Sequence, residues 1–589
     1  MTHITPNKDE PFNTSEVSEE LLMKHTKEIA KWTRLSGSKD EARSLEYVKN
    51  TLTDYEYDVH EYHFDSLVGY PKSAEMAVLK PGGKKFTGTT PALALSTPPR
   101  GVTANLTYVG KYDTHVSADL NGKIALIDGF SSPHLAKLSE VHGAVGQIFI
   151  NDDHAHEGIV SLVWGTPTPE TAHFLPKTPS ISITRPEGEY LIRLLKKGSV
   201  KVRLKTRSLR RWKKIPVVTA DLRGKEDDFV LFSGHIDSWY YGAMDNGTAN
   251  ATMLEVARII AHHRDLLRRG LRLAFWSGHS HGRYSGSAWY ADNFWEDLYL
   301  HCIAHVNIDS VGGIGATLLA GAYVMSEAKD FASSVVESVS GQKLVGRRFS
   351  RAGDQSFWGL GIPAMLMSLS EQPPGSSTAP SYVFGPNSGG LGWWWHIRED
   401  TVDKIDSTFL LRDAKIYVLL ISKLCTQPIL PFNYLATVGE IEQKLSELES
   451  QARGLFDLTP LIQRSKNLKD LVSKLNAQSA AVSQRIESRV DGGPGLDATV
   501  SKINTTIKLL GKFLIPVNYS KAGPFDHDLA GPITAVPVLD RMWELPTLKP
   551  NSDDFRFLST RLKRESNKIT YAFLEAERSI TRLLQEVDS

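Results

Sequence analysis

The stretch Ser233–Arg258, SGHIDSWYYGAMDNGTANATMLEVAR, decides the fold class, because it joins an apolar strand to a helix through a polar turn. The run FVLF at 229–232 is typical of a strand buried on both faces, and the apolar residues from Ala249 onward recur at helical spacing. Two further apolar runs, at 270–278 and 302–313, are expected to be strands. This order predicts an α/β fold with a parallel or mixed sheet and a site at the strands' carboxyl ends.

Imidazole and carboxylate side chains recur where these predicted strands end. They are His235, Asp237 and Asp245 in the first stretch, Asp309 in the second, and His396 and Asp400 in a third, GWWWHIREDTVDKID. Each alone is more often a turn former or an ordinary polar residue. Their recurrence favours a divalent metal site, since zinc prefers these groups where thiolates are absent. Asp237, two residues from His235, suits a catalytic supporting role that holds a ligand in place.

Two histidines, His279 and His281, lie just past the apolar run in the stretch 274–290, AFWSGHSHGRYSGSAWY. They can be metal ligands, proton carriers or ordinary loop residues. If this segment is extended, side chains two residues apart point to the same side. On that premise both histidines are expected to face the site.

The chain divides into three regions by sequence pattern. Residues 15–75 and 209–435 alternate between strand and helix patterns, and a helix is expected after an N-cap at Ser18. Residues 76–208 contain short apolar runs and turns, which indicates an inserted β-rich domain. Residues 436–589 are predominantly helical.

Composition excludes several classes of protein. Lys plus Arg number 68 against 67 for Asp plus Glu, so the balance gives no reason to expect binding to nucleic acid or an anionic membrane. Only Cys302 and Cys425 are present, which supports neither a disulfide framework nor a cysteine zinc site. The N-terminal residues lack the apolar core of a signal peptide, and no membrane-spanning run is evident. We therefore expect a cytoplasmic, multidomain protein.

Four motifs in order resemble the family of zinc aminopeptidases, glutamate carboxypeptidases and transferrin receptors. They are the opening stretch, FWSGHSHGRYSGSAWYADN at 275–293, VNIDSVGG at 306–313 and WWWHIREDTVDKID at 393–406. The resemblance implies a mixed-sheet zinc-exopeptidase-like catalytic domain, with a protease-associated domain inserted at 76–208. It further implies a helical dimerisation domain at 436–589, and hence a homodimer.

The resemblance also implies a ligand set. His235 and Asp309 would hold one metal ion, Asp245 would bridge two, and His396 would hold the second. Zinc is the default, iron or manganese are alternatives, and the choice between one ion and two is open.

The chain departs from the family at one place. The family has two adjacent glutamates, a general base and a ligand of the second metal, where this chain has His279 and Ser280. Trp276, Gly282 and the SGS at 285–287 fix the alignment. Because serine is a poor zinc ligand, we expect His279 to act as the base and His281 to replace the lost ligand, with the reverse assignment open.

Four residues are candidates for substrate binding. Trp395 and Trp358 would provide aromatic walls, and Arg351 and Arg398 would bind a carboxylate. The alternatives are that the tryptophans pack in the core and that the arginines are solvated.

The leading hypothesis is a metal-dependent hydrolase of amide-type bonds that uses metal-activated water on a small molecule or short peptide. The altered motif leaves a non-peptide amide, carbamate or urea substrate open, alongside an ordinary aminopeptidase or carboxypeptidase. The alternative from another class is a catalytically silent scaffold like the transferrin receptors. Retention of four ligand positions favours the enzyme, and nothing in the sequence supports non-hydrolytic metal chemistry.

Overall fold

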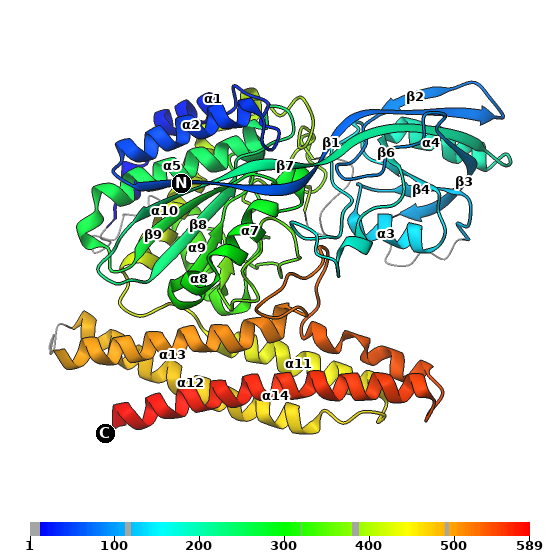
Figure 1. The fold of residues 1–589 in the computed structure, drawn as a ribbon. Coiled ribbons are helices and arrows are strands. Elements are labelled where there is room, and N and C mark those ends of the chain that lie inside the picture. The colour runs from blue at the N-terminus through cyan, green and yellow to red at the C-terminus, as the bar shows by residue number, and fades with distance from the viewer. Residues whose placement is uncertain (1–11, 112–118, 320, 380–387, 489–493, 589) are drawn as a thin grey trace.

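The protein consists of an α/β body, a smaller β-rich body and a layer of long helices (Figure 1). The structure is a computed structural model that describes residues 12–111, 119–319, 321–379, 388–488 and 494–588. Its strands are β1 (Asp58–Lys80), β2 (Lys85–Gly88), β3 (Val102–Lys111), β4 (Ile124–Asp128), β5 (Gly146–Ile150), β6 (Ser180–Ile183), β7 (Lys201–Leu222), β8 (Phe229–His235), β9 (Gly270–Trp276), β10 (Cys302–Asn307) and β11 (Ala364–Met365).

The α-helices occur in all three parts. They are α1 (Glu19–Ile29), α2 (Lys39–Asp54), α3 (Pro133–Val141), α4 (Arg185–Leu195), α5 (Ala249–His262), α6 (His279–Gly282), α7 (Ser285–Asn293), α8 (Trp295–His301), α9 (Lys329–Ser340), α10 (Ser407–Thr426), α11 (Tyr434–Ala452), α12 (Thr459–Glu487), α13 (Pro494–Tyr519) and α14 (Asp553–Asp588). Ser18 caps α1 as expected, because its side chain accepts a hydrogen bond from Leu21 N–H. No helix within the described ranges has the length and apolar character to span a membrane.

The α/β body is built on a mixed sheet, which confirms the predicted fold class. In the central part, β8 lies between β10 and β9 and is parallel to both, while β7 is antiparallel to β9. Every residue of β8 and β10 is buried, as expected for strands covered on both faces. The parallel arrangement brings the carboxyl ends of β8, β9 and β10 to the same sheet edge.

Two long strands connect the α/β body to the small body, which we define as residues 81–200. β1 and β7 pair in antiparallel register from Asp58 with Asp221 to Lys80 with Lys201, with irregularities on the way. At their far end β3 pairs with β7, and β4, β5 and β6 extend the sheet in parallel. The predicted boundaries at 75/76 and 208/209 fall inside these two continuous strands.

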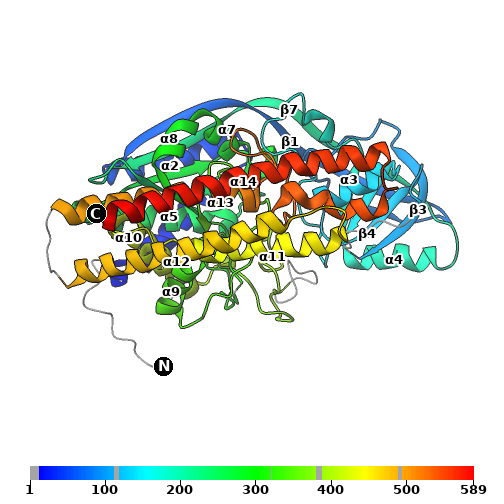
Figure 2. The same ribbon diagram turned by 90° about the horizontal axis from the view of Figure 1, so that it is seen from below.

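The helices α11 to α14 form an elongated layer beneath the α/β body, and Figure 2 shows them running side by side. Their contacts with each other bury apolar residues such as Leu445, Leu468, Leu510 and Phe573. The first of them, α11, also anchors this layer to the α/β body. Thr437 of α11 donates a hydrogen bond to the carboxylate of Glu327, with 2.8 Å between the two oxygens.

Glu327 makes this anchor sensitive to pH. Its side chain is buried, and burial raises its pKa from about 4.5 to about 7. Below pH 4.5 the carboxyl group is neutral in both folded and unfolded chains. Between these two pKa values only the unfolded chain ionises, so stability falls as pH rises through this window.

We therefore expect wild-type protein to lose up to about 3 kcal/mol of stability relative to Glu327→Gln as pH rises from 4.5 to 8. Glutamine keeps an acceptor for Thr437 but does not titrate in this range. Urea unfolding of both proteins across this range measures the difference. If the two sets of midpoints change in parallel with pH, Glu327 does not titrate as described.

Candidate metal centre

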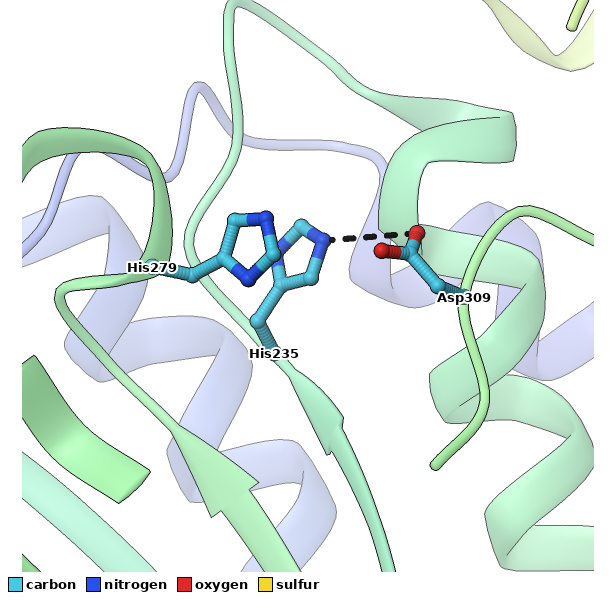
Figure 3. Close-up of side chains that lie close together, drawn as sticks. All are labelled: His235, His279 and Asp309. Atoms are coloured by element: carbon cyan, nitrogen blue, oxygen red, sulfur yellow. Dashed lines mark ion pairs between the residues drawn. The ribbon is translucent and has the colours of Figure 1, made fainter. Parts of the chain in front are cut away.

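The candidate site gathers at the sheet edge where β8, β9 and β10 end. His235 is the last residue of β8, His279 follows β9 at the start of α6, and Asp309 lies two residues past β10. Figure 3 shows these three side chains together. Each offers one possible ligand atom, and the three atoms all lie within 4.8 Å of one another. The sheet topology thus brings together residues that are far apart in the sequence.

Asp245, in the turn before α5, lies between two histidines. Its Oδ1 is 3.0 Å from Nε2 of His235, and its Oδ2 is 2.9 Å from Nε2 of His396. The same His235 nitrogen lies 3.6 Å from Oδ1 of Asp309. The four predicted ligands therefore form a continuous chain, with the Asp245 carboxylate in the bridging position.

The other ring nitrogen of each histidine fixes the tautomer. Nδ1 of His235 is 2.7 Å from the carbonyl oxygen of Asp237, and Nδ1 of His396 is 2.9 Å from that of Glu157. A carbonyl oxygen only accepts, so each Nδ1 carries the proton and each neutral ring presents a lone pair at Nε2. Those lone pairs face the Asp245 oxygens, which is repulsive unless a proton or cation lies between them.

The surroundings of His235 fit a bound cation. Its Nε2 is buried and makes no well-directed hydrogen bond to any described residue. Burial acts to lower the pKa of His235, but the carboxylates of Asp309 and Asp245 raise it well above its usual value. The site therefore favours positive charge at this nitrogen. A divalent ion supplies that charge, and two imidazoles with two carboxylates are ligands that zinc accepts.

A buried carboxyl group holds the turn that carries Asp245. Asp400 accepts hydrogen bonds from the backbone N–H groups of Met244 and Asp245, at 2.8 and 3.0 Å. Burial raises the pKa of Asp400 to about 7. The sequence placed Asp400 near the site, but its role depends on contacts across more than 150 positions that no local pattern reveals.

Asp237 contacts the segment that carries His279 through its carboxylate, and His235 through its backbone carbonyl. Its carboxylate accepts hydrogen bonds from Ser36 Oγ at 2.6 Å and from the backbone N–H groups of Ser280 and His279 at 2.9 and 3.3 Å. It therefore caps the amino end of α6, while its own carbonyl orients His235. Its Oδ1 also lies 3.7 Å from Nδ1 of His235, the nitrogen that does not face Asp245.

His279 lies in the site and is held by a carboxylate that the sequence did not single out for this role. Its Nδ1 is 2.6 Å from Oδ2 of Asp354, and its ring stacks on that of His235 with centroids 3.7 Å apart and planes at 14°. Oδ1 of Asp354 accepts a hydrogen bond from Ser287, whose hydroxyl is also 2.9 Å from that of Ser356. This buried network fixes the orientation of the imidazole.

The placement of His281 corrects the premise on which its role rested. Residues 279–282 form a helical turn rather than an extended segment, so side chains two positions apart diverge by about 200°. His281 is completely buried, with Nδ1 3.0 Å from Ser36 Oγ and its ring packed against Trp239 and Tyr70. This geometry does not place His281 with His235, His279 and Asp309, so its expected role as a metal ligand stays a prediction that the structure does not support.

The four predicted substrate-binding residues separate into two pairs. Trp395 stacks on His396 with ring centroids 3.5 Å apart, and the exposed Arg398 lies over the ring of Tyr240. Trp358 and Arg351 are buried, and the Arg351 guanidinium packs on Trp358 and on Trp164 of the small body. The second pair therefore has a packing role, which agrees with the alternative interpretation for Trp358 but not for Arg351, which that alternative expected to be solvated.

The chain is similar in sequence to known peptidases. Residues 217–421 match the model of peptidase family M28. The probable glutamate carboxypeptidase VP8 of Zea mays is 26% identical over 258 residues, which are 41% of this chain and 35% of that protein. The probable glutamate carboxypeptidase AMP1 of Arabidopsis thaliana is 22% identical, covering 76% of this chain and 73% of its own length. Aminopeptidase Y of Saccharomyces cerevisiae is 28% identical, covering 44% and 50%.

Solved structures share the fold. An aminopeptidase from Aneurinibacillus sp. strain AM-1 has a TM-score of 0.53 at 24% identity, covering 70% of this chain and 95% of its own. BSAP, a zinc aminopeptidase from Bacillus subtilis, has a TM-score of 0.50 at 19% identity, covering 71% and 96%. The chain spans only 35% of the length of the maize relative and half of the yeast one.

Proposed function

We propose that the protein is a metal-dependent hydrolase of amide-type bonds, because residues 217–421 match the model of peptidase family M28. One observation carries the proposal. The two oxygens of Asp245 face Nε2 of His235 and Nε2 of His396. In both histidines Nδ1–H donates a hydrogen bond to a backbone carbonyl oxygen. This arrangement is expected of metal ligands, and it is not expected in a scaffold protein that binds no metal.

The proposed ligands are His235, Asp245, Asp309 and His396. A carboxylate that faces a different histidine with each oxygen suits a bridge between two ions, so we favour two sites. Zinc is the default because the Bacillus subtilis protein that shares this fold is a zinc aminopeptidase. When bound, such an ion lowers the pKa of a water molecule and polarises the carbonyl under attack.

His279 is the proposed proton acceptor in place of the family's glutamate. Asp354 accepts a hydrogen bond from Nδ1–H, so the proton stays on Nδ1 and Nε2 has the lone pair that takes a proton from the attacking water. The same nitrogen then returns the proton to the leaving amine, while Asp354 stabilises the imidazolium. The rings of His279 and His235 are nearly parallel, so their in-plane lone pairs do not converge on one ion. This favours proton transfer over metal binding for His279.

The substrate is proposed to be a short peptide or a related small amide. Relatives carry names of both carboxypeptidases and aminopeptidases, and the altered motif keeps non-peptide amides, carbamates and ureas as candidates. The test is hydrolysis of a panel of aminoacyl anilides, acylated dipeptides and carbamates by the zinc-loaded protein. Activity that a chelator abolishes and added zinc restores is expected. A fully zinc-loaded protein that is inert on the whole panel would support the scaffold alternative.

We also propose that the protein is a homodimer formed through its helical layer. Phe557 and Tyr571, two heptads apart on α14, are 69% and 61% exposed, and Trp543 nearby is 59% exposed. Large aromatic side chains at this exposure are typical of surfaces that become covered. Light scattering at micromolar concentration is expected to give twice 65.3 kDa. Phe557→Ser with Tyr571→Ser should lower this mass toward the monomer, and a monomeric wild type would contradict the proposal.

A further inference from the structure

Arg283 is a buried cation with no acidic partner among the described residues. The residue is only 7% exposed. No described carboxylate lies within ion-pair distance of its guanidinium. Nη1 donates to the hydroxyl of Tyr284 at 3.3 Å, while Nε is buried with no hydrogen-bond partner among the described residues. Burying a charge in this way is costly unless a partner compensates it.

Other buried arginines in this chain show the contrast. Arg34 is completely buried, and its nitrogens donate to backbone carbonyls including those of Ile236 and Gly242. Arg269 is likewise buried and donates to the carbonyls of Leu424 and Gln427. Those two arginines hold loops together. Arg283 makes no comparable set of bonds to the described residues, so its charge is less well compensated than theirs.

The location of Arg283 is beside the candidate site. It directly follows α6, four residues after His279, and its carbonyl accepts a hydrogen bond from Gly165 N–H of the small body at 2.7 Å. Arg283 and Tyr284 both have left-handed backbone angles, with φ of 53° and 64°. Such strained pairs of non-glycine residues persist where the surrounding structure fixes them, often at functional sites.

A single aromatic ring separates the guanidinium from the proposed base. The Arg283 guanidinium carbon lies 4.8 Å from the ring centroid of Tyr284, and that ring meets the His279 ring edge-on at 4.8 Å between centroids. Trp164 of the small body packs against the same tyrosine at 4.3 Å. Residues of the α/β body and of the small body therefore both pack around Tyr284, which lies between the guanidinium and His279.

The unused edge of the guanidinium has a specific chemistry. With Nη1 engaged by Tyr284, the Nε and Nη2 hydrogens remain on one side of the planar group. Two parallel N–H donors match the two oxygens of a carboxylate, which is the geometry that distinguishes arginine from lysine. Arginine keeps its charge even when buried, so this edge is a permanent receptor for a planar anion.

We propose that Arg283 is a specificity-determining residue that binds a carboxylate group of the substrate through its Nε–Nη2 edge. This inference rests on the proposed hydrolase function and narrows it to substrates with a carboxylate near the scissile amide. The carboxylate is either the free C-terminus of a peptide or an acidic side chain. Its binding would compensate the buried charge and fix the amide relative to His279.

The test compares three acylated dipeptides that differ only in their carboxylates. One has a free C-terminus, the second is its C-terminal amide, and the third is an amide with a glutamate side chain. Wild-type protein should hydrolyse at least one carboxylate form with kcat/KM about 100-fold above that of the neutral amide. Arg283→Gln should remove this preference, and Arg283→Lys should restore only part of it.

The matched control is Arg43→Gln. Arg43 is an exposed arginine paired with Asp40, and its loss should leave all three rates unchanged. Equal wild-type rates on all three peptides, or a preference that survives in Arg283→Gln, would overturn the assignment. If the glutamine variant does not fold, Arg283→Lys carries the comparison, and a preference that it retains in full would overturn the assignment.

A binding measurement separates this inference from the hydrolase proposal. The hydrolase function is tested on the whole substrate panel, and if none of these three peptides is hydrolysed, glutarate is used as a carboxylate probe for Arg283. If Arg283 binds carboxylates, glutarate should raise the melting temperature of wild-type protein and of Arg43→Gln, but not of Arg283→Gln. An equal shift in all three proteins, or no shift in any of them, would overturn the role of Arg283.

Discussion

Replacing His279 with alanine is expected to lower kcat by roughly 100-fold or more while bound metal is retained. The proposed role of this imidazole is to move a proton at Nε2, and the ligands His235, Asp245, Asp309 and His396 do not depend on it. Steady-state kinetics and metal analysis of the same preparation measure both properties. Asp354→Asn should reproduce much of the loss, because an amide no longer compensates the imidazolium.

The outcome of His279→Ala distinguishes the two roles that a histidine can play here. Loss of metal together with activity would show that His279 is a ligand, as its proximity to His235 and Asp309 allows. Native turnover would show that it is neither ligand nor base. Only retained metal with lost turnover agrees with the proposed function.

The second large effect is expected from His235→Ala and from His396→Ala. Each removes a nitrogen that faces Asp245, so each should lower metal content and reduce kcat by roughly 1000-fold or more. Metal analysis after incubation with zinc and dialysis measures the first effect, and initial rates measure the second. His142→Ala, an exposed histidine of the small body, is the control and should change neither.

Either variant with full metal content and full turnover would remove that residue from the ligand set. A variant that retains metal but loses turnover would instead indicate that the histidine acts on the substrate. Circular dichroism confirms that the fold is intact in each case.

The fold class could be predicted from the sequence because its signals are local. The apolar run before His235 and the helical spacing after Ala249 are each confined to one element, and both elements are present. The boundaries of the small body are a different case. β1 and β7 each run without interruption through both bodies, so a change in sequence pattern partway along a strand does not mark an end of that strand.

The site could be predicted in part for the same reason. Strand ends identified His235, Asp309 and the stretch with His279, and the structure brings these three side chains together. The backbone between His279 and Gly282 could not be predicted, because four residues flanked by glycine carry too little pattern to separate a helical turn from an extended segment. That difference reversed the orientation expected for His281.

The supporting contacts were also beyond sequence reasoning. Asp354 lies 75 positions from His279, and Glu157 lies 239 positions from His396. Such pairs depend on how the small body and the loops close over the sheet edge. Arg283 belongs with them, because its burial and the lack of an acidic partner in the described part of the chain are properties of the folded chain alone.

The central claim is that His235, Asp245, Asp309 and His396 hold divalent metal. An anomalous difference map at the zinc absorption edge, from crystals grown with zinc, tests it most directly. The account predicts strong peaks in contact with the Asp245 carboxylate, one beside His235 and Asp309 and another beside His396. A map with no peak at Asp245, from crystals that show zinc elsewhere or none at all, would contradict it.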